Sequence, residues 1–232
     1  MAAALFGYAG LAEVNGADLL HAFIIGFETA SRMGNAISPA HYEAAWHITS
    51  TIGVIGAAVA VGRLCGLSQG SMVHAIGLAA TQASGFREMF GSIGKSFHSG
   101  RAAESGHLAV ILAEQGFTSS GRSLDGPRGY MNVLSAKHNA SLIDDQLGIH
   151  FNLRENAYKP FACGLVIHPT IDACCQIRLK PAFRLENIAS VSLRVSPIVF
   201  DLCNKKDIQT GLQSKFSVYH AAAIGFVRGR AD

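Results

Sequence analysis

Lys95, His98 and Arg101 bring two fixed positive charges and one titratable imidazole close together in a glycine-rich stretch of the chain. They lie where Ser99 could cap a helix over about residues 100–115. The N-terminus of a helix carries unpaired N–H groups and a partial positive charge, so it attracts anions. These residue types and their spacing predict a site for an anionic ligand. The alternative is a surface loop with scattered charges ahead of an ordinary packed helix.

A second candidate group, His47, stands ahead of several hydroxyl residues and a helix rich in glycine and alanine that we expect to end near Leu64. The small side chains of this helix allow close approach to neighbouring helices, which can bring His47 near groups from another segment. A histidine near neutral pH can take a proton or deliver one to a leaving hydroxyl. On the residues alone, however, a satisfied cap or core histidine is the more common situation.

Successive helices are expected to position these groups. Apolar residues at helical spacing predict a helix over residues 16–34, the glycine-rich helix covers about 48–64, and a serine-capped helix follows over about 68–85. Antiparallel helices with short connections indicate a helical bundle. Glu28 and Arg32 lie four residues apart on the first helix, and we expect an exposed or half-buried ion pair there rather than a catalytic carboxylate.

The composition changes after residue 120 to a turn-rich and then polar stretch, and we place a domain boundary near residue 150. Beyond it, Thr170 is expected to cap a short helix. Alternating apolar and polar residues over 188–196 predict a strand with one buried face. A further helix is expected from Lys215 onward.

The overall composition excludes several classes of function. The chain has 232 residues, of which 49% are hydrophobic and 15% charged, as in closely packed soluble helical proteins. A net charge of +3 without a basic run gives no support for a nucleic-acid partner. The five cysteines contain no CxxC pair, so we expect neither a disulfide framework nor a metal site, and a reducing cytoplasm. The longest apolar tract is too short for a membrane span, and no signal peptide is expected at the start.

The segment around the basic cluster resembles a known family. Met89-Phe90-Gly91, Lys95, His98, Gly100-Arg101-Ala102-Ala103 and Gly116-Phe117-Thr118 together resemble the MmgE/PrpD family, which includes 2-methylcitrate dehydratase and cis-aconitate decarboxylase. The similarity continues on both sides and covers most of the chain. It implies a mainly α fold, with an all-helical, bundle-like domain over 1–150 and a smaller α/β lid domain over 151–232. Family members are much longer, so both domains are expected to be partial, and a homodimer is expected.

The resemblance also implies roles for individual residues. Trp46-His47 ahead of the Thr/Ser-rich turn matches the family's active-site histidine segment, and Lys159 and His168 resemble a lysine and a histidine that lead into its lid. His220 falls where many relatives carry a tyrosine, and Tyr219 precedes it. We therefore expect catalytic roles for His47, His168, Lys95 and Lys159, and substrate-binding roles for His98, Arg101, Tyr219 and His220.

This set of residues is cationic and titratable. Fixed lysines can bind the carboxylates of a substrate and stabilise the enediolate-like charge that develops when a proton leaves the neighbouring carbon. The resemblance implies a lyase that needs neither cofactor nor metal and acts on a small di- or tricarboxylate, like 2-methylcitrate dehydratase. Decarboxylation of a cis-aconitate-like acid, epimerisation of an aminated dicarboxylate such as iminodisuccinate, and a truncated, non-catalytic role in assembly are the alternatives.

Overall fold

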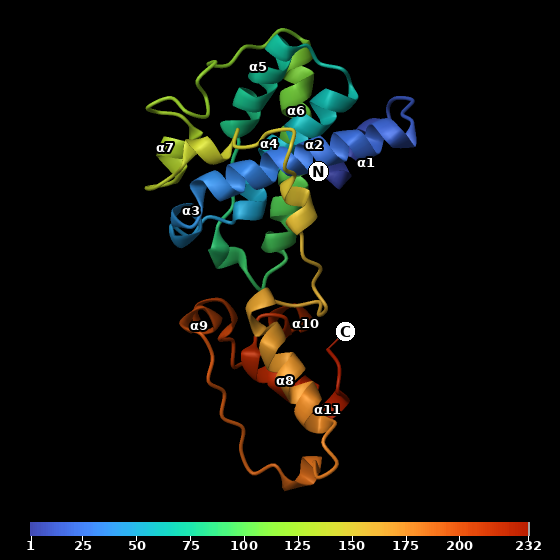
Figure 1. The fold of residues 1–232 in the computed structure, drawn as a ribbon, viewed down its shortest axis with the longest axis vertical. Coiled ribbons are helices and arrows are strands. Elements are labelled where there is room, and N and C mark those ends of the chain that lie inside the picture. Colours follow the sequence, from blue (N-terminus) through green and yellow to red (C-terminus); the bar gives the residue numbers. More distant parts are fainter. Residues whose placement is uncertain (232) are drawn as a thin grey trace. The chain divides into compact units, whose positions relative to one another are not determined.

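The structure is a computed structural model that describes residues 1–231, and it is mainly α-helical, as expected (Figure 1). The chain forms two compact units. The first contains residues 1–88 and 94–156, and the second contains residues 89–93 and the chain from 157 onward. No helix within the described residues combines the length and the apolarity that a membrane crossing needs.

The first unit is built around one central helix. Its helices are α1 (Ala2–Ala9), α2 (Gly16–Ile37), α3 (Ala40–Glu43), α4 (Ile48–Leu64), α5 (Gln69–Ala80), α6 (Gly94–Glu114) and α7 (Tyr130–Leu134), with 3-10 turns at Arg87–Met89, Ala140–Leu142 and Asn152–Glu155. Helix α4 contacts α1, α2, α5 and α6 (Figure 1). It is therefore the element against which the rest of the unit packs.

Small residues make this arrangement possible. A Cβ atom on Gly26 of α2 would lie 2.5 Å from the Gly56 carbonyl oxygen, and one on Gly106 of α6 would lie 2.6 Å from the Ala57 Cβ. Both distances are far shorter than a van der Waals contact, so α2 and α6 approach α4 almost backbone to backbone. The prediction that α4 admits close neighbours is confirmed.

Helices α2 and α5 start where we predicted but end elsewhere. Helix α2 begins at Gly16 but continues past Gly34 to Ile37, and α5 stops at Ala80, five residues before Gly85. The predicted cap of α5 is confirmed, since the Ser68 hydroxyl accepts a hydrogen bond from the Ser71 N–H at 3.1 Å. A glycine lowers helix stability without excluding a helix, and Gly34 is retained because it packs against α4 through Ile52.

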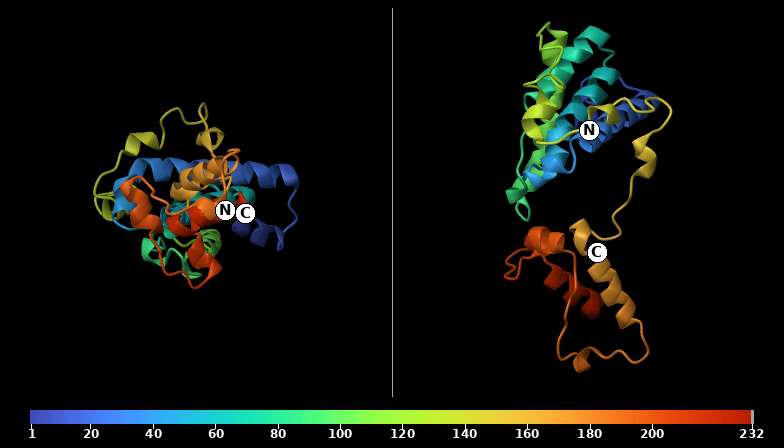
Figure 2. Two further views of the ribbon diagram at one scale, coloured as in Figure 1. Left: turned by 90° about the horizontal axis from the view of Figure 1, so that it is seen from below. Right: turned by 60° about the vertical axis from the view of Figure 1, so that its left-hand side comes forward.

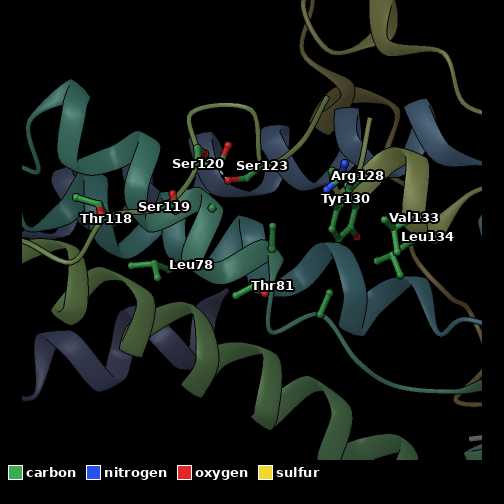
Figure 3. A pocket seen from close by; sticks show the side chains of 14 residues that line it. Leu78, Thr81, Thr118, Ser119, Ser120, Ser123, Arg128, Tyr130, Val133 and Leu134 are labelled. Atoms are coloured by element: carbon green, nitrogen blue, oxygen red, sulfur yellow. Dashed lines mark hydrogen bonds between the residues drawn. The ribbon is translucent and has the colours of Figure 1, made fainter. Parts of the chain in front are cut away.

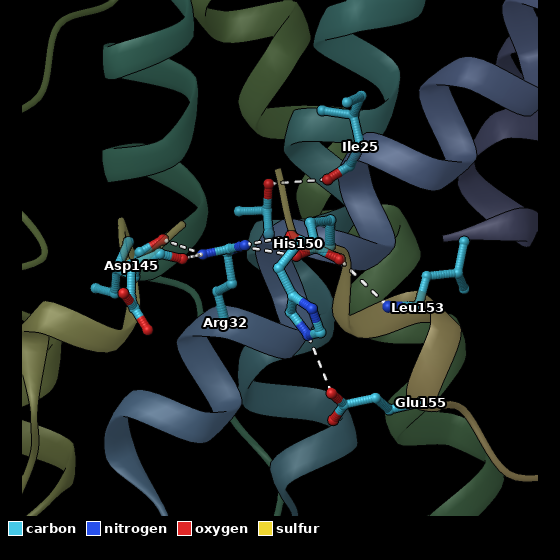
Figure 4. A network of polar contacts seen from close by, with 9 residues as sticks. Ile25, Arg32, Asp145, His150, Leu153 and Glu155 are labelled. Atoms are coloured by element: carbon cyan, nitrogen blue, oxygen red, sulfur yellow. Dashed lines mark hydrogen bonds and ion pairs between the residues drawn. The ribbon is translucent and has the colours of Figure 1, made fainter. Parts of the chain in front are cut away.

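The Glu28–Arg32 ion pair is buried, so the expectation of an exposed or half-buried pair was wrong. Arg32 Nε donates to Glu28 Oε1 at 2.7 Å, and both side chains are about 5% exposed. The remaining guanidinium N–H groups donate to the backbone carbonyls of Ile143, Asp145 and His150 (Figure 4). Tertiary contacts across the returning loop bury the pair, and the spacing of two residues on one helix cannot show such contacts.

The second unit is also helical. It contains α8 (His168–Arg178), α9 (Pro197–Cys203), α10 (Gly211–Ser214) and α11 (Val218–Arg228), with 3-10 turns at Leu165–Ile167 and Leu185–Asn187. Helices α8 and α11 lie side by side (Figure 2). Helix α8 starts two residues before Thr170, with Pro169 in its first turn, so Thr170 is not the cap that we expected. Helix α11 starts at Val218 and is capped by the Ser217 hydroxyl.

The strand predicted over 188–196 does not form, so the expected α/β character of the second domain is not seen in residues 157–231. The alternation itself is real, because Leu193 and Val195 pack against buried side chains of this unit while Arg194 and Ser196 are exposed. A strand also needs a neighbouring strand to take its backbone hydrogen bonds. Within the described chain, strand-type pairing is limited to two isolated bridges, Trp46 with Phe86 and Asn204 with Ser217.

Candidate active site

His47 and His98 meet in the first unit. Their Nδ1 atoms lie 2.9 Å apart, although the residues are 51 positions apart in the chain. His47 is the residue immediately before α4 and His98 belongs to α6, and the two side chains are buried, with 4% and 8% of their residue surfaces exposed. The close packing of α4 against α6 brings together the histidine expected to be catalytic and one expected to bind substrate.

A short backbone pairing holds His47 in place. The His47 N–H donates to the Gly85 carbonyl at 3.0 Å, and the Arg87 N–H donates to the Ala45 carbonyl at 2.9 Å. Gly85 has φ +112°, and a Cβ atom there would lie 3.1 Å from the His98 Nδ1. Glycine at this position therefore serves two purposes, since it permits the left-handed backbone and leaves room for the His98 ring.

The contact between the two Nδ1 atoms defines the protonation states of the pair. A hydrogen bond requires one Nδ1–H and one bare Nδ1, because two N–H donors would repel each other. In the neutral pair, the ring that donates has a bare Nε2, and the ring that accepts carries its proton on Nε2. The pair therefore offers one basic nitrogen and one N–H donor at the same time.

Burial and positive charge keep the pair neutral near pH 7. Burial lowers the pKa of His47 to about 4, helped by the charge of Lys95 and by His98. Burial and Lys95 also lower the pKa of His98. Since a neutral imidazole is the form that accepts a proton, both shifts keep the pair in that form at physiological pH.

The start of α6 differs from the prediction. The helix begins at Gly94, so Ser99 lies inside it and does not cap it. Lys95 consequently lies in the first turn, one turn before His98, and its charge acts on both histidines. Arg101 follows one turn after His98, but its guanidinium forms an exposed ion pair with Glu104 at 2.9 Å. The charge of Lys95 therefore acts on the histidine pair, whereas Arg101 is paired with Glu104.

His41 supports this site and was not identified from the sequence. It is fully buried, its Nδ1 lies 2.7 Å from the Leu134 carbonyl, and its Nε2 lies 2.7 Å from the Thr51 hydroxyl. Because a carbonyl only accepts, Nδ1 carries the proton and Nε2 accepts from Thr51. The ring also stacks on Trp46 at 5.9 Å. His41 therefore braces the residue before His47 and the first turn of α4; its only sequence signal was its position six residues before His47.

The other predicted site residues belong to the second unit. His168 is the first residue of α8 and is 7% exposed, and its ring lies edge-on to Phe161 at 5.4 Å. Its buried Nε2 has no hydrogen-bond partner within residues 1–231. The exposed Lys159 donates to the Cys163 carbonyl at 3.3 Å.

Tyr219 and His220 lie in the first turn of α11 and are both exposed. The Tyr219 hydroxyl hydrogen-bonds to the Asn204 side-chain oxygen at 2.8 Å, while the His220 backbone N–H donates to Ser217. Each of these groups is placed within its own unit.

In the part of the chain that the structure describes, no three His, Cys, Asp or Glu side chains lie close enough together to hold a metal ion.

Comparison with known proteins identifies the family. The MmgE/PrpD N-terminal domain matches residues 1–143, and the MmgE/PrpD C-terminal domain matches residues 161–232. The chain belongs to the MmgE/PrpD family, which confirms the resemblance seen in the sequence.

Several relatives are named as cis-aconitate decarboxylases or as similar to them. The chain is 28% identical to cis-aconitate decarboxylase of Aspergillus terreus over 197 residues, which are 79% of this chain and 40% of the relative. It is 27% identical to a cis-aconitate decarboxylase-like protein of Aspergillus oryzae over 201 residues, 81% of this chain and 42% of the relative. With human cis-aconitate decarboxylase it shares 27% identity over 169 residues, 72% and 35% of the two chains. The chain thus spans about 40% of the length of the curated relatives that it matches.

Proposed function

We propose that this chain carries the acid–base centre of a lyase that needs no cofactor and acts on a small di- or tricarboxylate. The observation that carries the proposal is the buried contact of 2.9 Å between the Nδ1 atoms of His47 and His98. A neutral histidine pair beside a lysine suits the removal of a proton from the carbon next to a carboxylate. Membership of a family that contains lyases supports the same assignment.

In this proposal the bare Nε2 of the pair takes the α-proton, and the electron pair left behind is delocalised into the adjacent carboxylate. Lys95 stabilises the resulting enediolate-like charge. In a dehydration, this electron pair then forms a carbon–carbon double bond, and the hydroxyl on the next carbon leaves as water after it has taken a proton from an N–H donor of the site. The substrate is neither oxidised nor reduced overall, so the step needs no redox partner.

Decarboxylation of a cis-aconitate-like acid uses the same groups, but here the histidine pair delivers a proton to the substrate instead of removing one. The bond to one carboxylate breaks, carbon dioxide leaves, and the electron pair shifts the double bond so that its far carbon takes a proton. The Nε2–H of the pair is the proposed proton donor. The names of the relatives favour this reaction over dehydration of 2-methylcitrate or epimerisation of iminodisuccinate.

We propose roles for four residues of the second unit as well. The exposed ammonium of Lys159 has donors available for a substrate carboxylate, and the unpartnered His168 Nε2 is available for proton transfer. We assign substrate contacts to Tyr219 and His220 as well. Arg101 is a weaker candidate, because binding a carboxylate there competes with its ion pair to Glu104. A homodimer is part of the same proposal.

The test is proton NMR of the purified protein in deuterium oxide with cis-aconitate, 2-methylcitrate, citrate and iminodisuccinate. We expect deuterium incorporation or product formation with one of them, and its loss in His47→Asn. The matched control is His21→Asn, because His21 is exposed on α2. A folded wild type that binds a substrate without exchange or turnover, or a His47→Asn variant with unchanged exchange, would contradict the proposal. Stable assembly without turnover would favour the non-catalytic alternative.

A further inference from the structure

A cavity of about 540 Å³ lies in the first unit and contains neither histidine of the candidate active site. It is bounded by the end of α5, the serine-rich loop after α6 and the start of α7 (Figure 3). Its volume falls within the roughly 300–1,000 Å³ that small-molecule sites occupy. The chemistry of its lining indicates which ligand it would suit.

Part of the lining is cationic and polar. Arg128 is exposed at the cavity and, within the described chain, has neither an ion pair nor a hydrogen bond. The hydroxyls of Thr81 and Thr118 are likewise exposed there. By contrast, the hydroxyls of Ser119 and Ser123 already donate to the carbonyls of His74 and Ser120. Arg128 is thus the charged group of the lining, and its N–H donors suit an oxyanion.

The buried part of the lining contains an unsatisfied donor. Tyr130 is 5% exposed, and its hydroxyl has no hydrogen bond within residues 1–231, although the Thr51 hydroxyl lies near enough to act on it. Burial raises the pKa of Tyr130, so the hydroxyl stays protonated and can donate. The hydroxyl oxygen itself exposes less than 1 Å² of surface, so Arg128 is the polar group of the lining that a ligand can reach most readily.

Other residues of the lining are apolar, and two of them, Val133 and Leu134, lie next to Arg128 (Figure 3). The apolar residues are Leu78, Ala80, Ala83, Val133 and Leu134. Val133 is 66% exposed, so an apolar ligand placed here would shield surface that water now contacts. A site for inorganic phosphate would need only the polar groups, whereas this lining combines a cationic group with apolar side chains.

The shape of the cavity is fixed by close packing. A Cβ atom on Gly77 would overlap the hydroxyls of Ser119 and Ser123, so the serine-rich loop lies directly on α5. The Tyr130 N–H donates to the Ser123 carbonyl at 2.8 Å, which ties the start of α7 to the same loop. The cavity therefore forms without a ligand.

We propose that this cavity binds a small organic anion, with a carboxylate or phosphate head held by Arg128 and a short hydrocarbon body against Val133 and Leu134. The binding is independent of the lyase chemistry proposed above. It concerns a different set of side chains and does not require turnover.

The test uses titration calorimetry with hexanoate, hexanol and inorganic phosphate as probes. We expect hexanoate to bind more tightly than either of the others, and Arg128→Gln to weaken it at least tenfold. The matched control is Arg122→Gln, because Arg122 pairs with Asp125 on the same loop and does not line the cavity. His47→Asn should also leave hexanoate binding unchanged.

Four results would overturn the proposal. They are a folded wild type that binds no hexanoate, equal binding by Arg128→Gln, phosphate binding as tight as that of hexanoate, and loss of hexanoate binding in His47→Asn. The third would show that the apolar residues are not used, and the fourth would place the anion at the histidine pair. Circular dichroism of each variant confirms that it is folded.

Discussion

The pH dependence of unfolding tests the histidine pair without any substrate. His47 has a pKa of about 4 in the folded protein against 6.5 ordinarily. Between these two values the unfolded chain binds a proton that the folded chain does not, so the free energy of unfolding falls as the pH falls from 7 to 4. The stabilisation is complete above pH 6.5 and is lost on acidification.

The size of the effect follows from the same two values. A difference of about 2.5 pH units, at 1.36 kcal/mol for each, gives about 3 kcal/mol as the upper limit for one histidine. The variant His47→Asn removes the titrating ring but keeps a hydrogen-bonding group near the position of Nδ1. Between pH 7 and pH 4, we expect the free energy of unfolding of the wild type to fall by about 2 to 3 kcal/mol more than that of this variant. His98 and His41, whose pKa values are also lowered, remain in both proteins.

The assay is urea unfolding followed by tryptophan fluorescence at several pH values. Trp46 is the single tryptophan of the chain, stacks on His41 and precedes His47, so its signal reports the first unit. Asparagine is a better helix cap than histidine and can stabilise α4 by roughly 1 kcal/mol at every pH, so the comparison rests on the pH slope. The exposed His21→Asn serves as the control. If the free energy of unfolding depended on pH equally in the wild type and in His47→Asn, the buried, neutral histidine pair would be refuted.

Two further changes test the packing that positions the pair, both measured by urea unfolding. Gly26→Ala should lower the free energy of unfolding by about 2–4 kcal/mol, because its Cβ would lie 2.5 Å from the Gly56 carbonyl, whereas Gly16→Ala, where nothing lies within 4 Å, should stay within about 0.5 kcal/mol. A large effect at Gly16 or none at Gly26 would contradict the packing. Arg32→Gln should cost about 3–5 kcal/mol because it leaves the Glu28 carboxylate buried without its partner, and a loss below about 1 kcal/mol would mean that the pair is solvated.

The sequence predicted the helical character well because that signal is local. The cap at Ser68 and the span of α4 depend on neighbouring residues, and both are seen. Ser99 also carried a cap signal, yet α6 runs through it. A serine cap is only an alternative to continuing the helix, and packing of α6 on α4 decides between them. The alternation over 188–196 predicted the partly buried Leu193 and Val195, but neither the exposure of Val191 nor the lack of a pairing strand among the described residues.

The site was predictable residue by residue, but its geometry was not. His47 and His98 were both named from the chain, with separate roles. Their shared hydrogen bond depends on how closely α6 can approach α4, which Gly106 decides through its contact with Ala57. His41 lacked any motif, and its importance follows from contacts to Thr51 and Leu134 that only the folded chain forms.

The buried Arg32 has a consequence for the order of events during synthesis. The carbonyls that receive its guanidinium N–H groups lie 111, 113 and 118 residues further along the chain. At translation rates of about 5–20 residues per second, α2 waits roughly 6 to 24 s on the ribosome for them. During that interval Glu28, four residues earlier on the same helix, can already neutralise the guanidinium. Helix α2 can therefore dock against α4 as a charge-balanced element, before the segment that completes its hydrogen bonds has been made.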